Sequence, residues 1–157
     1  METSLEPSNP GQLKSHGASI FASSPQQTIQ YATEIAKALV PIIDQQKMYV
    51  TIQGKRHISV EAWLTLGSIV GILPRESAVK ELPDGSFEAH VDLLNRDGRV
   101  VGGASAICGI EEPRWSKAER YARRSMATTR ATAKAYRLAF GWIAQLSGYE
   151  PTPAKEM

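Results

Sequence analysis

The residues best suited to chemistry are cations in one long segment, from Ser116 to about Ser147, in which Glu119 is almost the only acid. At about 100° per residue, a helix would place four of these cations in one narrow stripe, with a fifth at its edge. Alanines flank the stripe, which keeps a helix stable and lets another backbone come close. The stripe consists of Arg123, Arg130, Lys134 and Arg137, with Arg120 at its edge.

Such a stripe suits a polyanion, and the commonest polyanion is nucleic acid. The other interpretation is a solvated face of a surface helix. Tyr121, Trp142 and Ile143 fall on the side away from the stripe, so we expect them in the core.

A second basic pair, Lys55 and Arg56, lies at a turn that follows Gln53-Gly54. A helix is expected to begin shortly afterwards, with Ser59 as its cap. Free N–H groups and the helix dipole favour phosphate at such a position. Both cations can equally be read as exposed turn residues.

Residues typical of catalysis or of metal binding are scarce. The chain has no Gly-rich phosphate loop with a suitable lysine, no nucleophile elbow and no cluster with metal-ligand spacing. Cys108 is the single cysteine, and no histidine neighbours the serine and threonines of the basic segment. We therefore expect a binding protein without a cofactor or a metal rather than an enzyme. The histidines, which are scattered, are His16, His57 and His90.

The pattern of apolar residues and turns predicts the order α-β-β-α-β-β-β-α. Ser24-Pro25-Gln26-Gln27 is typical of a helix start, and Pro41 is expected to end or kink that helix. The predicted elements that follow are strands 48–52 and 56–58, a helix from Val60 to about Val70 stopped by Gly71 and Pro74, strands 76–82, 87–95 and 100–110, and the basic helix. This order indicates an α+β fold in which an antiparallel sheet, a hairpin plus a three-stranded meander, packs against helices.

The length of 157 residues fits one domain, and the net charge of +2 excludes a histone-like polycation. Residues 1–23 are predicted to be a flexible tail, 24–148 the domain, and 149–157 a short second tail. No secretory signal or membrane-spanning run is apparent, and a cytoplasmic location is expected.

Three segments together resemble a known family. YVTIQGKRHISVEAWLTLG resembles the hairpin, Gly-x-Arg turn and following helix of the single-strand annealing proteins typified by the eukaryotic recombination protein Rad fifty-two. FEAHVDLLNRDGRVVGGASAICG resembles the central hairpin of that family, and ATTRATAKAYRLAFGW resembles its closing helix. The similarity covers about Ser24 to Gly148, and the short chain looks most like the phage annealing recombinases.

The resemblance implies a protein that acts in DNA recombination and repair by binding single-stranded DNA and annealing complementary strands without ATP. It implies rings or filaments, and a basic groove between hairpin and closing helix. A partner exonuclease or single-strand-binding protein is a further possibility. Arg56 and Lys134 match basic positions of the family, Arg137 is shifted by one residue, and Ala135 stands where a second cation often occurs. The DNA-binding residues expected are Lys55, Arg56, Arg120, Arg123, Arg130, Lys134 and Arg137.

Two other functions stay open on the sequence. One is a nucleic-acid module without annealing activity, such as a single-strand protector or an RNA binder. The other is a small scaffold or enzyme whose basic stripe packs against acids or binds an anionic metabolite.

Phosphate contacts predict salt-dependent binding that is insensitive to base sequence. In a salt titration with single-stranded oligonucleotides, the logarithm of the binding constant should fall with the logarithm of the salt concentration by about 0.7 per phosphate contacted. A binding constant that is independent of salt would contradict a phosphate-based interface.

Overall fold

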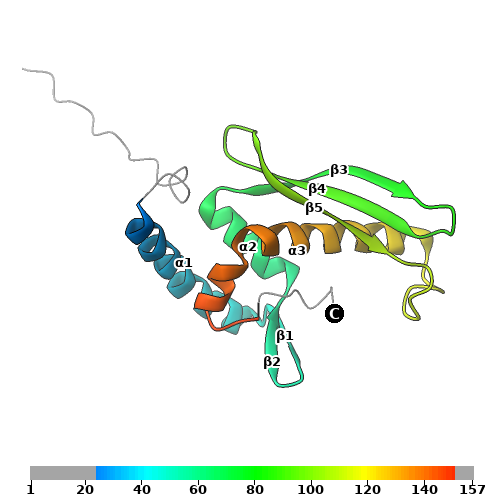
Figure 1. Cartoon of the computed structure of the whole chain (residues 1–157). Coiled ribbons are helices and arrows are strands. Elements are labelled where there is room, and N and C mark those ends of the chain that lie inside the picture. Colours follow the sequence, from blue (N-terminus) through cyan, green and yellow to red (C-terminus); the bar gives the residue numbers. More distant parts are fainter. Residues whose placement is uncertain (1–23, 151–157) are drawn as a thin grey trace, which may run out of the picture.

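The computed structural model describes residues 24–150 (Figure 1). The elements follow the predicted order and are α1 (Pro25–Gln46), β1 (Tyr49–Ile52), β2 (Lys55–Ile58), α2 (Val60–Val70), β3 (Leu73–Glu81), β4 (Phe87–Leu94), β5 (Val100–Cys108) and α3 (Arg120–Leu146). The predicted tail 1–23 and residues 151–157 of the predicted tail 149–157 lie outside the described part.

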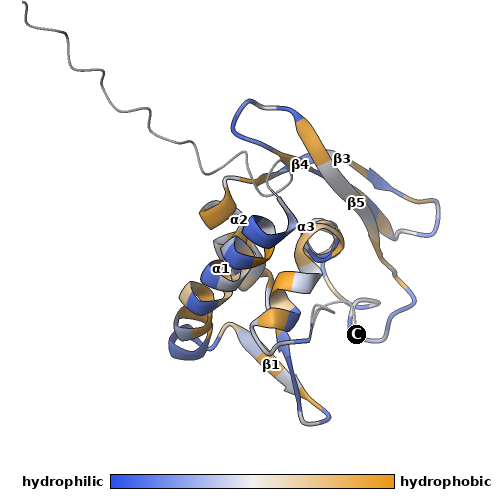
Figure 2. Ribbon diagram, turned by 60° about the vertical axis from the view of Figure 1, so that its left-hand side comes forward, coloured by the Kyte–Doolittle hydropathy of each residue, from blue (hydrophilic) through white to orange (hydrophobic). Residues whose placement is uncertain are grey.

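The strands form two separate antiparallel sheets, a hairpin β1-β2 and a meander β3-β4-β5. The meander covers α3, while α1 and α2 pack on the second half of that helix and the hairpin projects to the other side (Figure 1). The turns at both ends of the meander are hydrophilic, as expected where strands reverse in solvent (Figure 2). The α+β class is thereby confirmed.

The start of α1 confirms the predicted capping box. The Ser24 hydroxyl accepts the Gln27 N–H, and the Gln27 side chain accepts the Ser24 N–H. Pro41 does not end the helix, because α1 continues to Gln46. Pro41 lies on the exposed side, and the next turn still buries Ile43 in the core, so packing outweighs one missing hydrogen bond.

Two other predicted boundaries shift. Helix α3 begins at Arg120 rather than Ser116, because the Glu112 carbonyl accepts the N–H groups of Trp115 and Ser116 at 2.8 and 2.9 Å and holds that segment in turns. Strand β3 begins at Leu73, so Pro74 lies inside a strand. Because β3 is an edge strand, a missing N–H on its outer side is tolerated.

The core divides into two clusters along α3. Trp63, Tyr136 and Phe140 are fully buried between the three helices. Beneath the meander, Ala127 and Ala131 of α3 contact the inward-facing residues of β4 and β5. The small residues of α3 thus let a second backbone come close, and that backbone is the chain's own sheet.

Tyr149 and Glu150 belong to the domain, so the predicted boundary at 148 lies too early. Tyr149 is buried against Tyr49, with ring centroids 6.1 Å apart, and its hydroxyl donates to Asp44. Burial is the main cause that raises the pKa of Tyr149 to about 12, and the Asp44 hydrogen bond adds to it. The Glu150 N–H donates to the Arg56 carbonyl at 2.9 Å.

A buried contact between α2 and α3 leaves no room for a side chain at Gly67. A Cβ at this position would lie 2.5 Å from the Tyr136 ring and 2.6 Å from the Ile72 carbonyl oxygen. We expect Gly67→Ala to lower the free energy of unfolding by about 1–2 kcal/mol, because overpacking exceeds the gain in helix propensity. Urea unfolding measures this effect. Ser68→Ala, an exposed neighbour on α2, should change stability by less than about 0.5 kcal/mol.

Candidate nucleic-acid interface

The predicted basic stripe of α3 faces the meander. Arg130 donates to the Ile107 carbonyl at 3.0 Å, and Lys134 donates to the Ser105 carbonyl at 3.2 Å. Both carbonyls belong to β5, the edge strand opposite β3. These two cations therefore cap the outer carbonyls of a sheet edge, and helix and strand run side by side.

Arg123 is a structural residue. Its side chain is buried, and its guanidinium donates to the carbonyls of Gly85 at 3.3 Å, Trp115 at 3.4 Å and Ala118 at 2.5 Å. One cation thus joins the β3-β4 turn to the segment that leads into α3. Arg123 cannot contribute to a surface for phosphates, contrary to the sequence-based expectation.

Arg130 is also occupied within the fold. Its two terminal nitrogens donate to the two carboxylate oxygens of Glu112 at 2.8 and 2.6 Å, and its side chain is only 17% exposed. The hydrogen bonds from Arg130 hold the pKa of Glu112 below its usual value. Glu112 also accepts the Gly109 N–H at 2.6 Å. We therefore exclude Arg130 from the candidate nucleic-acid interface.

The remaining predicted α3 residues differ in exposure. Lys134 and Arg137 are half-buried, and Lys134 contacts β5. Arg120 is exposed and pairs with Glu81, which lowers the pKa of that carboxyl group. An exposed pair of this kind contributes little to stability, so its arginine can exchange partners.

The hairpin cations, Lys55 and Arg56, are exposed at the position that the sequence predicts. The Lys55 ammonium lies 3.7 Å from the Glu150 carboxylate, and the Arg56 guanidinium lies 3.4 Å from Asp44. Arg56 also stacks over the Tyr49 ring at 4.9 Å from its centroid. These contacts fix Arg56 while leaving half of its side chain exposed.

A basic and aromatic group at the beginning of α3, the α3 start cluster, is the clearest exposed site. It comprises Arg114, Lys117, Arg120 and Arg124, with Trp115 and Tyr121 among them. The Arg114 guanidinium lies over the Trp115 ring at 5.3 Å, and Tyr121 is 75% exposed. The expectation that Tyr121 is buried was wrong, since its side chain lies in open hollows beside β3. Cations interleaved with aromatic rings are typical of single-strand binding.

Two hollows of about 600 and 370 Å³ adjoin this cluster and share Tyr121 and Arg124. Their walls also carry the hydroxyls of Ser125, Thr128 and Thr129, together with Glu76 and Glu81 of β3. Acids and bases nearly balance in these hollows, so they do not by themselves form a phosphate site.

The structure therefore separates the predicted residues into two groups. Lys55, Arg56 and Arg120 are exposed, whereas the stripe contacts β5 and the segment before α3. The predicted DNA-binding residues did not include Arg124. On a helical wheel Arg124 lies away from the stripe, in a segment with few acids, and this position could have indicated an exposed cation.

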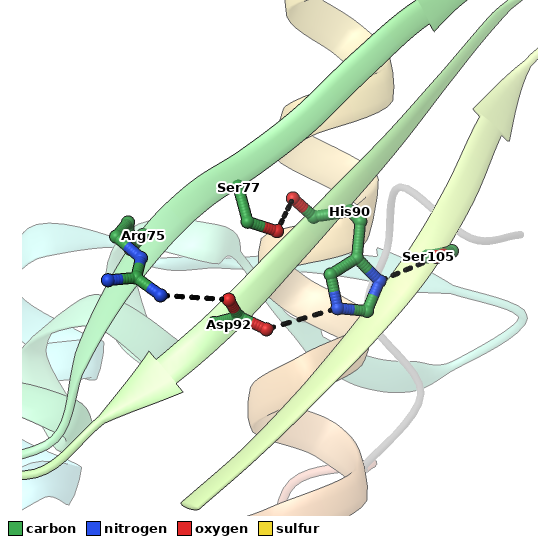
Figure 3. Close-up of polar contacts among 5 residues, drawn as sticks. All are labelled: Arg75, Ser77, His90, Asp92 and Ser105. Carbon is green, nitrogen blue, oxygen red and sulfur yellow. Dashed lines mark hydrogen bonds and ion pairs between the residues drawn. The ribbon is translucent and has the colours of Figure 1, made fainter. Parts of the chain in front are cut away.

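The outer face of the meander holds a polar network that sequence reasoning also missed (Figure 3). Arg75 donates to Asp92 at 3.2 Å, His90 Nε2 lies 3.1 Å from the same carboxylate, and His90 Nδ1 lies 2.7 Å from the Ser105 hydroxyl. Three strands contribute these residues, so their proximity depends on pairing that no local pattern reveals.

We expect Arg123→Met to lower the free energy of unfolding by about 2–3 kcal/mol, because three carbonyls lose a charged donor. The neighbouring Arg124→Met removes the same charge from an exposed position and should change stability by less than about 0.5 kcal/mol. Chemical denaturation of both variants tests the assignment. Equal stability of the two variants would show that Arg123 has no structural role.

Between residues 24 and 150, no three histidine, cysteine or acidic side chains gather as a possible metal site, and no helix is long and apolar enough to cross a membrane. No protein-family model matches this chain, and no curated protein or solved structure matches it. The residues and their geometry are therefore the basis for assigning a function.

Proposed function

We propose that this chain binds single-stranded DNA and anneals complementary strands without ATP, as the resemblance of its sequence implies. The observation that carries the proposal is the α3 start cluster, in which exposed cations alternate with the half-buried Trp115 and the exposed Tyr121. The order of helices and strands is the one that the pattern of apolar residues and turns predicts. The finer assignment, a Rad-type annealing fold, is part of this proposal.

The proposed DNA path follows α3 from its start cluster toward the hairpin cations. Figure 1 shows the meander on one side of α3 and the hairpin projecting on the other. At 1.5 Å per residue, the 27 residues of α3 extend over about 40 Å, which spaces the two basic groups along one strand. Lys134 and Arg137 lie in the second half of α3, beyond its start cluster.

Exposed ion pairs make the cations available. Arg56 with Asp44 and Arg120 with Glu81 are surface pairs of low net stability, so a phosphate can replace the carboxylate. Lys117 and Arg124 have no ion pair within the described residues. The interface that we propose consists of Lys55, Arg56, Arg114, Lys117, Arg120 and Arg124, with Lys134 and Arg137 at its side.

In the proposed mechanism, cations hold the phosphates of one strand while its bases face outward. A second strand then tests pairing where its charge is partly neutralised. Base pairing supplies the free energy, so nucleotide hydrolysis is not required. One subunit offers few phosphate contacts, so tight binding requires a homo-oligomer, a ring or a filament. We propose that it acts in the cytoplasm, in recombination of a phage type.

The test is the loss of single positive charges. Arg56→Gln and Arg124→Gln should each weaken binding of a fluorescent single-stranded oligonucleotide by about threefold to tenfold, with the same ratio for different sequences. Lys37→Gln, which removes one exposed charge from α1, is the matched control and should bind as the parent does. Fluorescence anisotropy measures binding, and a complementary-strand assay without nucleotide measures annealing.

Two outcomes would contradict the proposal. If neither variant differs from Lys37→Gln, the assigned surface is wrong. If the parent binds single strands but does not accelerate annealing, the chain is a single-strand protector or an RNA binder, and a parallel titration with RNA separates these two. Absence of any polynucleotide binding would favour a scaffold or an anion-binding protein.

A further inference from the structure

The polar network on the outer face of the meander has the arrangement of a nucleophile with its base. Ser105 Oγ lies 2.7 Å from His90 Nδ1, and His90 Nε2 lies 3.1 Å from Asp92 Oδ1 (Figure 3). Asp92 Oδ2 accepts from Arg75 at 3.2 Å. The order serine, histidine, carboxylate is the order in which a hydroxyl is activated for attack.

The partners of the imidazole determine which nitrogen carries its proton. An ionised Asp92 can only accept, so in the neutral imidazole Nε2 carries the proton and Nδ1 presents a lone pair. The Ser105 hydroxyl then donates to Nδ1. Hydrogen bonds from Arg75, first, and from His90 lower the pKa of Asp92, which keeps the carboxylate in its accepting form.

Gly103 makes room for this arrangement. A Cβ at this position would lie 2.8 Å from the Val91 carbonyl oxygen, 3.3 Å from His90 Nε2 and 3.4 Å from Asp92 Oδ1. The space beside Gly103 is therefore filled by the histidine and the carboxylate, and any larger residue would displace them.

The serine is accessible, and it lies at the edge of the sheet. Ser105 is exposed, and its carbonyl points outward to Lys134 at 3.2 Å. In an antiparallel ladder the N–H and C=O of one residue point to the same side, so the Ser105 N–H also faces the open edge. A backbone N–H on the nucleophile itself is one of the donors that stabilise an oxyanion in acyl transfer.

We propose that Ser105 is a nucleophile that takes the acyl group of small carboxylic esters, with His90 as its general base. Ser105 Oγ forms a bond to the acyl carbon while its proton moves to His90 Nδ1. The bond from carbon to the leaving oxygen then breaks, and that oxygen takes the proton from His90. Water, activated by the same nitrogen, releases the acid and restores the serine. Asp92 and Arg75 are positioning residues.

The probe is p-nitrophenyl acetate, with release of p-nitrophenolate followed by absorbance and the acetylated residue located by peptide mass spectrometry. We expect an acetyl group on Ser105 that forms at least tenfold faster than on Ser125, another exposed serine. Ser105→Ala should abolish this adduct. His90→Gln should slow it at least tenfold, since an amide in its place cannot take a proton, and Asp92→Asn should slow it similarly.

Ser77→Ala is the matched control, because the Ser77 hydroxyl donates to the His90 carbonyl at 3.2 Å but lies outside the relay. Ser77→Ala should leave the rate of Ser105 acetylation unchanged. The relay is the set of Ser105, His90 and Asp92. Thermal unfolding of each variant separates lost reactivity from lost structure, and where His90→Gln unfolds, Asp92→Asn decides. The proposal is overturned if Ser105 reacts no faster than Ser125, or if folded His90→Gln or Asp92→Asn reacts as the parent does. Annealing assays are independent of this result.

Discussion

The fold depends on the register between α3 and the edge of β5. Four residues of helix, from Arg130 to Lys134, advance by about 6 Å, and two residues of strand, from Ser105 to Ile107, advance by about 6.6 Å. Because these steps nearly match, successive cations of the helix meet successive outward carbonyls of the strand. The contacts cap the outward carbonyls of Ser105 and Ile107 on this edge strand. Arg123 extends the same connection to the β3-β4 turn.

This register explains how a helix without acids packs against the sheet. The Glu112 carboxylate pairs with Arg130, and the Ser105 carbonyl accepts a hydrogen bond from Lys134, so these cations of the stripe have partners within the domain. Exposed cations remain at the beginning of α3 and on the hairpin, and they are the ones that the proposed DNA interface uses. The set of Ser105, His90 and Asp92 lies on the outer face of the meander, so it adjoins the proposed DNA interface only where Lys134 contacts the Ser105 carbonyl.

Local patterns predicted the elements well, because their causes are local. The capping box at Ser24, the stop at Gly71 and the alternation along β4 each depend on neighbours within a few residues. The helical wheel also grouped the stripe correctly, but it cannot tell what lies opposite a face. Arg123 and Arg130 therefore read as surface cations, although turns, the segment before α3 and the edge of β5 occupy them. The sequence did not predict the contacts among Ser105, His90 and Asp92 for the same reason, since Ser105 meets the other two only through strand pairing.

The contact of Tyr149 and Glu150 with the hairpin has a consequence for folding kinetics. A two-stranded hairpin has little stability alone, and this one is held by residues far along the chain: Tyr149 packs on Tyr49, and the Glu150 N–H donates to the Arg56 carbonyl. Closing so long a loop lowers the chain entropy before the new contacts can stabilise the structure. The hairpin should therefore reach its final position late, after α3 has assembled on the meander, and it should be the first part to detach when the domain is pulled from its C-terminal side.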